Sequence, residues 1–152
     1  YGLWPSAQTR EAVNGGKLPL QPALSYVTEI VAVQQIAAGE PVGYGTTFHA
    51  PRAMRVGIIP LGYADGIPRA LSNAGAVLVD GARCAIVGRV AMNMCFIDLT
   101  HARNALVGSN VTLIGRDGDA EVSVDDWAAW GDTINYEIVT RLPSTLAREY
   151  RS

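Results

Sequence analysis

One tyrosine stands between two glycines shortly after an apolar run, in the stretch Val42-Gly43-Tyr44-Gly45-Thr46-Thr47-Phe48. Glycines on both sides let the backbone turn sharply and let another surface come close, so the phenol is expected to project from a strand end. Such a phenol can bind a ligand or transfer a proton, although an interface tyrosine in a turn has the same local pattern. A free phenol has a pKa of about 10, so accepting a proton near neutral pH requires positive or hydrogen-bonding neighbours. No Lys or Arg stands beside Tyr44 in the sequence.

Three later stretches contain further tyrosines and arginines at defined distances from Tyr44. They are Gly62-Tyr63-Ala64-Asp65-Gly66-Ile67-Pro68-Arg69, Val87-Gly88-Arg89-Val90-Ala91-Met92-Asn93-Met94 and Thr133-Ile134-Asn135-Tyr136-Glu137. In this order and at these separations, the four stretches resemble the C-terminal domain of alanine racemase. The resemblance extends from the first residues to about residue 148, and the four motifs together are far more specific than any one of them.

This resemblance implies an enzyme that interconverts L- and D-alanine, a small amino-acid substrate, for peptidoglycan synthesis. Alanine racemases use pyridoxal 5'-phosphate as an electron sink, and two opposed bases remove and return the α-proton. In the family, one base is the lysine that carries the cofactor on an N-terminal TIM barrel. The other base is a tyrosine that the C-terminal domain supplies to the partner subunit of a homodimer, and the motif match places it at Tyr44. The chain is therefore expected to hold half of an active site and to be inactive alone.

The resemblance also assigns roles to side chains around the entrance of the active site. Tyr63 is similar to an inner gate residue and Arg69 to an outer one, whereas a packed tyrosine and a surface arginine are the alternatives. Met92 resembles the residue whose backbone amide holds the substrate carboxylate. Arg89 resembles a residue of the entrance corridor.

Tyr136 resembles the tyrosine that donates to the cofactor phosphate and narrows the pocket around the substrate side chain, and Ile134 would line the entrance. Two departures from the family pattern bear on the substrate. Asn93 stands where the family usually has Asp, and Ile67-Pro68 replaces a pair that is more commonly aromatic or polar. A serine racemase or a broad-specificity racemase is therefore an alternative. Because Tyr136 fills the room that a hydroxymethyl group would need, alanine is favoured.

Composition restricts the other possible functions. The 152 residues fit one domain, 1–152, with 49% hydrophobic and only 17% charged residues, so part of the surface is expected to be covered by a partner. A net charge of -2 and the lack of a Lys/Arg run argue against nucleic-acid binding. No apolar run is long enough for a membrane span, and the chain is expected to be cytoplasmic. It begins at Tyr1 without a Met, which reads as a cut inside a longer polypeptide.

Hydrophobic runs predict strands over 24–35, 54–61, 76–79, 82–90, 94–99 and 111–114. Asp80-Gly81 predicts a hairpin turn and Asp117-Gly118 another turn, whereas residues 5–22 read as a loop. Ser123 and Asp126 predict a capped helix that ends at Gly131. A second helix is expected over 134–142, with Asp132 or Thr133 as cap and Pro143 as stop. These elements predict a mainly β domain, a closed Greek-key-like β-barrel or a sandwich, with two short helices near the C-terminus.

The rival hypothesis is a non-catalytic interaction module of the same fold. It is favoured because residues that could carry chemistry lack the partners or the position that they would need. Cys84 and Cys95 have no ligand-like partners, so no metal site is expected. Asp65 and Asp98 are interpreted as caps of backbone amides rather than as an acid-base pair. The only lysine, Lys17, lies in a Pro/Gly loop and is no candidate for carrying the cofactor.

Overall fold

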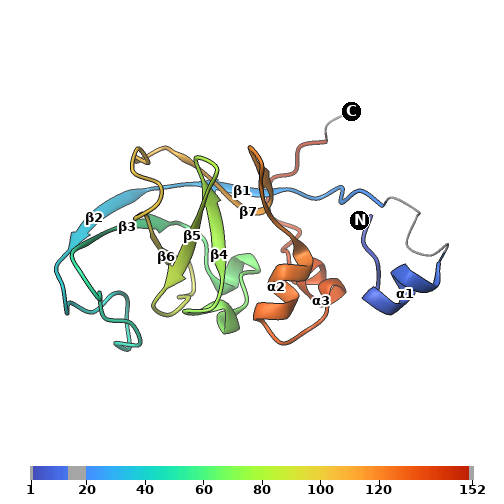
Figure 1. Cartoon of the computed structure of the whole chain (residues 1–152), viewed down its shortest axis with the longest axis horizontal. Coiled ribbons are helices and arrows are strands. Elements are labelled where there is room, and N and C mark those ends of the chain that lie inside the picture. Colours follow the sequence, from blue (N-terminus) through green and yellow to red (C-terminus); the bar gives the residue numbers. More distant parts are fainter. Residues whose placement is uncertain (1, 14–19, 151–152) are drawn as a thin grey trace.

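The computed structural model describes residues 2–13 and 20–150, and antiparallel strands make up most of the regular structure in these ranges (Figure 1). The prediction of a mainly β domain is confirmed. The strands are β1 (Tyr26–Glu29), β2 (Ala32–Ile36), β3 (Met54–Ile59), β4 (Ala76–Val79), β5 (Ala82–Val87), β6 (Cys95–Asp98), β7 (Asn110–Asp117) and β8 (Ala120–Val122). The helices are α1 (Ala7–Ala12), α2 (Val124–Trp130) and α3 (Asn135–Thr140), with 3-10 turns η2 (Tyr63–Asp65) and η3 (Arg69–Leu71).

The strands form one curled sheet in the order β1-β7-β4-β5-β6-β3-β2, with β8 added to β7. All pairings between the described strands are antiparallel. The sheet is a half-barrel, so the prediction of a closed barrel is wrong. Its two end strands, β1 and β2, follow each other along the chain and do not pair with each other. Closure by a hydrogen-bonded ladder would require the two end strands to lie side by side.

The predicted long strand over residues 24–35 is interrupted at Ile30 and Val31. The Ile30 amide donates to the Ser109 carbonyl (3.0 Å), on the side of β7, whereas the Val31 amide donates to the Ile58 carbonyl of β3 (2.9 Å). The chain therefore changes sheet partners within two residues. A continuous hydrophobic run does not reveal such a change, because both halves keep β-type residues.

The hairpin predicted at Asp80-Gly81 is confirmed. Strands β4 and β5 pair from Val79 opposite Ala82, and both turn residues have positive φ, 51° for Asp80 and 72° for Gly81. An Asp-Gly pair adopts these left-handed angles at little cost, which matches the twist of the two strands. Because β4 is buried along its whole length, this hairpin contributes strongly to the core.

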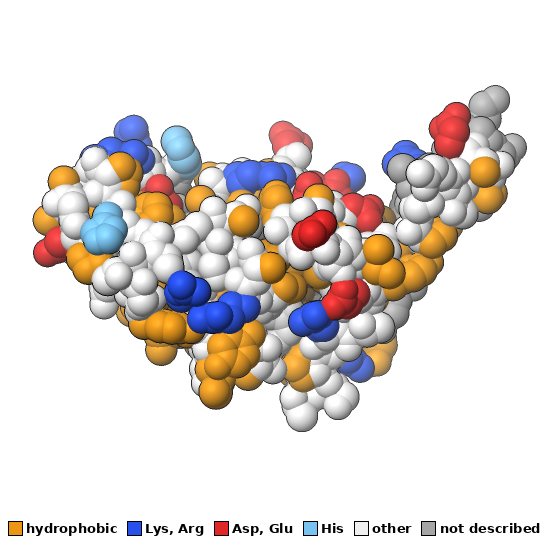
Figure 2. Space-filling view, turned by 90° about the horizontal axis from the view of Figure 1, so that it is seen from below, with side chains coloured by type: hydrophobic (Ala, Val, Ile, Leu, Met, Phe, Trp, Pro, Cys, Tyr) orange, Lys and Arg blue, Asp and Glu red, His pale blue; other side chains and the backbone are white. Residues whose placement is uncertain are grey.

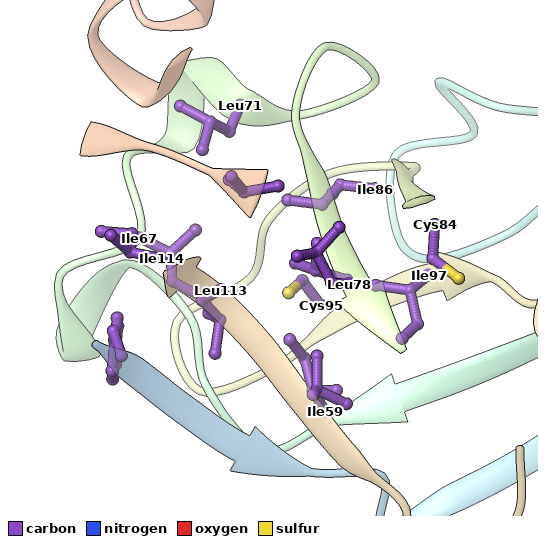
Figure 3. Close-up of a cluster of buried hydrophobic side chains, with 14 of the residues drawn as sticks. Ile59, Ile67, Leu71, Leu78, Cys84, Ile86, Cys95, Ile97, Leu113 and Ile114 are labelled. Atoms are coloured by element: carbon purple, nitrogen blue, oxygen red, sulfur yellow. The ribbon is translucent and has the colours of Figure 1, made fainter. Parts of the chain in front are cut away.

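Buried aliphatic side chains from the two halves of the sheet meet inside the curl. Figure 3 shows Ile59 of β3, Leu78 of β4 and Leu113 of β7 converging on this interior. Trp127 of α2 closes one end and is fully buried, with its ring 6.4 Å from that of Tyr26 in an edge-on contact. Helices α2 and α3 lie together beside the sheet, so the C-terminal segment completes the core (Figure 1).

The predicted cap of α2 is confirmed: the Ser123 hydroxyl accepts from the Asp126 amide (3.0 Å), and the Asp126 carboxylate accepts from the Ser123 amide (2.8 Å). Helix α3 is shorter than predicted, because Ile134 is its N-cap and Arg141 follows its last residue. None of the helices in the described ranges is long and apolar enough to cross a membrane.

The prediction of a loop over residues 5–22 is wrong for Ala7–Ala12, which form α1. Its cap is Ser6, whose hydroxyl accepts from the Thr9 amide (3.0 Å). The glycines and the proline at positions 14–19 that suggested a loop lie outside the described residues, as does Lys17. A single turn of helix after a serine is too short to produce a hydrophobic period, so only the cap signals it.

Candidate functional site

Tyr44 lies at the tip of a loop between β2 and β3, with 52% of its surface exposed. A bridge between Pro41 and His49 closes the base of this loop, and the Val42 amide donates to the Phe48 carbonyl (3.0 Å). Val42 is buried in a second apolar cluster together with Met54, Val56 and Val87. The phenol is therefore presented to solvent by a loop whose base is fixed.

Both glycines beside Tyr44 have a left-handed backbone, with φ of 72° at Gly43 and 76° at Gly45, which fits the sharp turn expected there. They also permit close packing. A Cβ on Gly43 would lie 3.3 Å from Cε2 of Phe96, and one on Gly45 would lie 3.0 Å from Nε of Arg89. Arg89 therefore runs alongside the Tyr44 loop.

The guanidinium of Arg69 donates a hydrogen bond to the Tyr44 hydroxyl, at 3.1 Å from Nη2 to Oη. The observation that no cation stands beside Tyr44 therefore does not hold in three dimensions. It rested on neighbours in the sequence, whereas Arg69 is 25 residues away along the chain. A guanidinium that donates to a phenol oxygen stabilises negative charge there.

Tyr44, Tyr63 and Arg69 line one pocket with a volume of about 570 Å³. Gly66, Pro68 and Arg141 complete much of its wall. Arg141 was missed by sequence reasoning. It follows α3 and is paired with Glu137, and nothing in its local sequence distinguishes it from a surface ion pair.

Backbone hydrogen bonds join the Tyr63 and Met92 stretches. The Tyr63 amide donates to the Ala91 carbonyl (2.9 Å), and the Ala64 amide donates to the Met92 carbonyl (3.0 Å). Gly62 permits this approach, since a Cβ there would lie only 2.1 Å from the Ala91 oxygen. Met92 is 55% exposed, and its own amide donates to no group in the described part of the chain. An amide without a partner can bind an anion.

Tyr136 and Ile134 lie at the start of α3, with 42% and 61% of their surfaces exposed. Neither lines the pocket around Tyr44, so the structure does not bring all the predicted residues together. Within the described ranges, the Tyr136 hydroxyl has no hydrogen-bond partner. A free phenol on the surface is a donor suited to a phosphate oxygen.

Six large hydrophobic side chains of the motif stretches are exposed to solvent. On the side seen in Figure 2, hydrophobic and basic side chains lie next to one another in the lower part of the view. Where exposed apolar side chains are neighbours, as Tyr44 and Tyr63 are in the pocket, they are typical of a surface that another protein covers. The six are Tyr44, Tyr63, Met92, Met94, Ile134 and Tyr136.

Two aspartates near these stretches cap backbone groups, as predicted. The Asp65 carboxylate accepts from the Gly62 amide (2.9 Å), and the Asp98 carboxylate accepts from the Thr100 amide (2.8 Å). The Asp65 carbonyl also accepts from the buried Tyr26 hydroxyl (2.9 Å). Burial, with the charge of Asp65 as a smaller cause, raises the pKa of Tyr26 well above its ordinary value, so this phenol stays a donor.

Comparisons with known proteins give one consistent result. The family model described as "Alanine racemase, C-terminal domain" matches residues 23–150. An alanine racemase from Leptospira interrogans is 45% identical over 151 residues, covering 97% of this chain and 39% of the relative. The chain thus spans about two fifths of the length of the curated relatives that it matches.

Solved structures agree with this result. The alanine racemase from Bacillus anthracis with bound L-Ala-P superimposes with a TM-score of 0.86 and 38% identity, over 94% of this chain and 36% of that one. The alanine racemase from Bartonella henselae with covalently bound pyridoxal phosphate gives a TM-score of 0.78 and 33% identity, over 86% of this chain and 36% of that one.

Proposed function

The chain belongs to the alanine racemase family as a C-terminal domain, and from this premise we propose that Tyr44 is one of two bases of an amino-acid racemase. The reaction is the interconversion of L- and D-alanine, which supplies D-alanine for peptidoglycan. The second base is a lysine of an N-terminal TIM-barrel domain. Tyr44 acts in the site of the partner subunit of a homodimer.

The single observation that carries this proposal is the hydrogen bond from Arg69 to the exposed Tyr44 hydroxyl, at the edge of a pocket. A tyrosine base must bear negative charge on its oxygen before it takes a proton from carbon. The guanidinium stabilises that charge, and the pocket leaves room for a small substrate. A tyrosine that only packs at an interface has no need of a charged donor at its oxygen.

The remaining site residues have distinct tasks in this proposal. The free amide of Met92 binds the substrate carboxylate. Tyr63, Arg69 and Arg89 flank the entrance beside Tyr44, where two arginines attract the carboxylate of a zwitterionic amino acid. Ile134 lies outside the Tyr44 pocket and lines the entrance from the start of α3. Asn93 is exposed next to Met92 and adds no charge there, so serine is the competing substrate to be tested beside alanine.

The free hydroxyl of Tyr136 fits a donor to the phosphate of pyridoxal 5'-phosphate, and no described residue of this chain offers an amine to carry the cofactor. When bound, that cofactor withdraws electrons from the substrate and makes its α-hydrogen acidic. Tyr44 then removes or returns that hydrogen, as a proton, on one face of the substrate. Tyr136 also limits the size of the substrate side chain, which favours alanine over serine.

Replacing Tyr44 with Phe in the full-length protein tests the proposal, because Phe keeps the ring and removes the acid-base group. Racemisation is expected to fall by roughly 10² to 10⁴-fold. Exchange of the α-hydrogen with solvent deuterium is expected to be lost mainly from L-alanine, whose hydrogen faces the tyrosine. Tyr150→Phe is the matched control, since Tyr150 is 92% exposed and lies outside the pocket. Near-normal turnover of the Tyr44→Phe protein would refute the proposal.

A further inference from the structure

Five consecutive residues, from Arg69 to Asn73, contact the Tyr44 loop at two separate points. At one end, the Arg69 guanidinium donates to the Tyr44 hydroxyl (3.1 Å). At the other end, the Asn73 side-chain amide donates through Nδ2 to the Thr47 carbonyl (3.2 Å). The segment thus holds both the tip of the tyrosine side chain and the backbone three residues after it.

The side-chain oxygen of Asn73 makes a second contact, with the residue that follows β5. Its Oδ1 accepts from the Gly88 amide at 2.6 Å. Gly88 lies against the base of the loop, because a Cβ there would be 2.6 Å from the Val42 carbonyl oxygen. One amide group therefore connects the end of β5 to Thr47, so that the loop is fixed from both sides.

The chemistry of position 73 favours asparagine. Its backbone is left-handed, with φ of 59°, a conformation that asparagine adopts more readily than most residues. An asparagine also offers one donor and one acceptor on the same planar group, whereas aspartate offers acceptors only. Both the loop carbonyl and the Gly88 amide are then satisfied by a single side chain.

The Arg69–Asn73 segment is itself held in place. The Ser72 hydroxyl accepts from the Val90 amide (3.0 Å) and donates to the Arg69 carbonyl (2.5 Å). Leu71 is fully buried in the main core. A fixed segment can transmit its position to the Tyr44 loop, which a mobile one could not do.

We propose that Asn73 is a positioning residue that holds the Tyr44 loop through Thr47 and thereby sets where the phenol meets the substrate. The inference rests on the proposed role of Tyr44 as a base. Asn73 does not line the pocket, so it acts through the loop and not by touching the substrate. A displacement of about 1 Å between reacting groups can cost roughly 10²-fold in rate.

Asn73→Asp is the informative substitution. Aspartate keeps the acceptor for Gly88 and tolerates the left-handed backbone, but it places a carboxylate oxygen against the Thr47 carbonyl. Asn104→Asp is the matched control, because Asn104 is exposed on the loop between β6 and β7 and makes the same change of charge. Asn73→Gly is the second variant, since glycine removes both side-chain bonds without backbone strain.

The first readout is hydrogen-deuterium exchange of this chain without its cofactor. Peptides that cover Val42–Phe48 are expected to exchange faster in Asn73→Asp and Asn73→Gly, with β3 and β4 unchanged. Asn104→Asp should match the parent chain. Unchanged exchange of the loop in both Asn73 variants would overturn the inference, as would a uniform increase over the whole domain.

The second readout is racemisation by the full-length protein. Asn73→Asp is expected to lower kcat roughly ten- to hundredfold with little change in KM, and to reduce deuterium exchange from L-alanine more than from D-alanine. An equal loss from both enantiomers would overturn the inference, because general destabilisation has that effect. If Tyr44→Phe itself stays active, the proposed function fails. Faster hydrogen-deuterium exchange of the loop in the Asn73 variants would then still support the inference that Asn73 holds the Tyr44 loop in place.

Discussion

Nη2 of Arg69 lies 3.1 Å from the hydroxyl oxygen of Tyr44, although 25 residues separate the two along the chain. In this pair, a charged guanidinium donates a hydrogen bond to the exposed phenol. The pair also means that the isolated domain already contains part of the environment that a tyrosine base requires.

Replacing Arg69 with Met removes the donor while keeping a long apolar stem. Because a hydrogen bond from a charged donor contributes about 1.5–3 kcal/mol, racemisation by the full-length protein should fall roughly ten- to hundredfold. Arg69→Lys should restore part of the loss, since it keeps the charge but not the planar fork. Arg116→Met is the control, as Arg116 forms only an exposed ion pair with Glu121. Equal rates for Arg69→Met and Arg116→Met would contradict the prediction.

Gly45→Ala should damage both stability and activity. A left-handed alanine costs about 1–2 kcal/mol, and its Cβ would also meet Nε of Arg89 at 3.0 Å. Gly39→Ala is the matched control, because Gly39 has a φ of 84° and nothing within 4 Å of the added Cβ. Both variants should unfold at lower urea concentrations than the parent. Only Gly45→Ala should also slow racemisation, and a slow Gly39→Ala protein would show that backbone strain alone explains the effect.

Stability should fall under alkaline conditions because of two buried thiols. Burial raises the pKa of Cys95 to about 12, and burial with the nearby charges of Asp98 and Asp80 raises that of Cys84 to about 12, from an ordinary value of 9.0. A raised pKa in the folded state stabilises the fold fully below pH 9.0. That contribution is lost as the pH rises from 9.0 toward 12, since the unfolded thiols ionise first.

Urea unfolding at about pH 7 and about pH 10.5 measures this effect. The parent chain should lose more free energy of unfolding between the two conditions than a Cys84→Ala, Cys95→Ala double variant. The cavities in the double variant lower its free energy of unfolding at both pH values, so their effect cancels when the two conditions are compared. An equal loss in both proteins would rule out the thiols as the cause.

This chain alone should neither bind pyridoxal 5'-phosphate tightly nor racemise alanine. Its sequence contains one lysine, Lys17, set among glycines and prolines, so no amine is placed for the cofactor. Adding the cofactor and reducing with borohydride measures covalent binding. A stoichiometric adduct on Lys17 would overturn the prediction, and Lys17→Arg shows whether any trace adduct is specific.

Features with a local chemical signature could be predicted from the sequence. The cap formed by Ser123 and Asp126 depends on two residues three positions apart, and the hairpin at Asp80-Gly81 depends on two adjacent ones. The sharp turn at the glycines around Tyr44 belongs to the same class. In each case, the physical cause lies within one turn of backbone.

Features that arise from distant contacts could not be predicted in this way. The bond between Arg69 and Tyr44 and the place of Arg141 in the pocket wall depend on how the sheet curls. The change of sheet partner at Ile30 and Val31 depends on Ser109 and on β3, which no local pattern reports. The closed barrel was predicted from strand number, whereas closure depends on pairing between the two end strands.

The pairing of β1 with β7 also sets an order of events during synthesis. Glu29 lies opposite Asn110, so β1 leaves the ribosome roughly 80 residues before its only partner in the described sheet. At about 5–20 residues per second, β1 waits roughly 4–16 s, whereas a hairpin such as β4 with β5 forms in about 1–10 μs. The first strand of this sheet to be made is thus among the last to be paired. A nascent chain stalled before residue 110 would carry β1 as an open edge available to another nascent chain or to a chaperone.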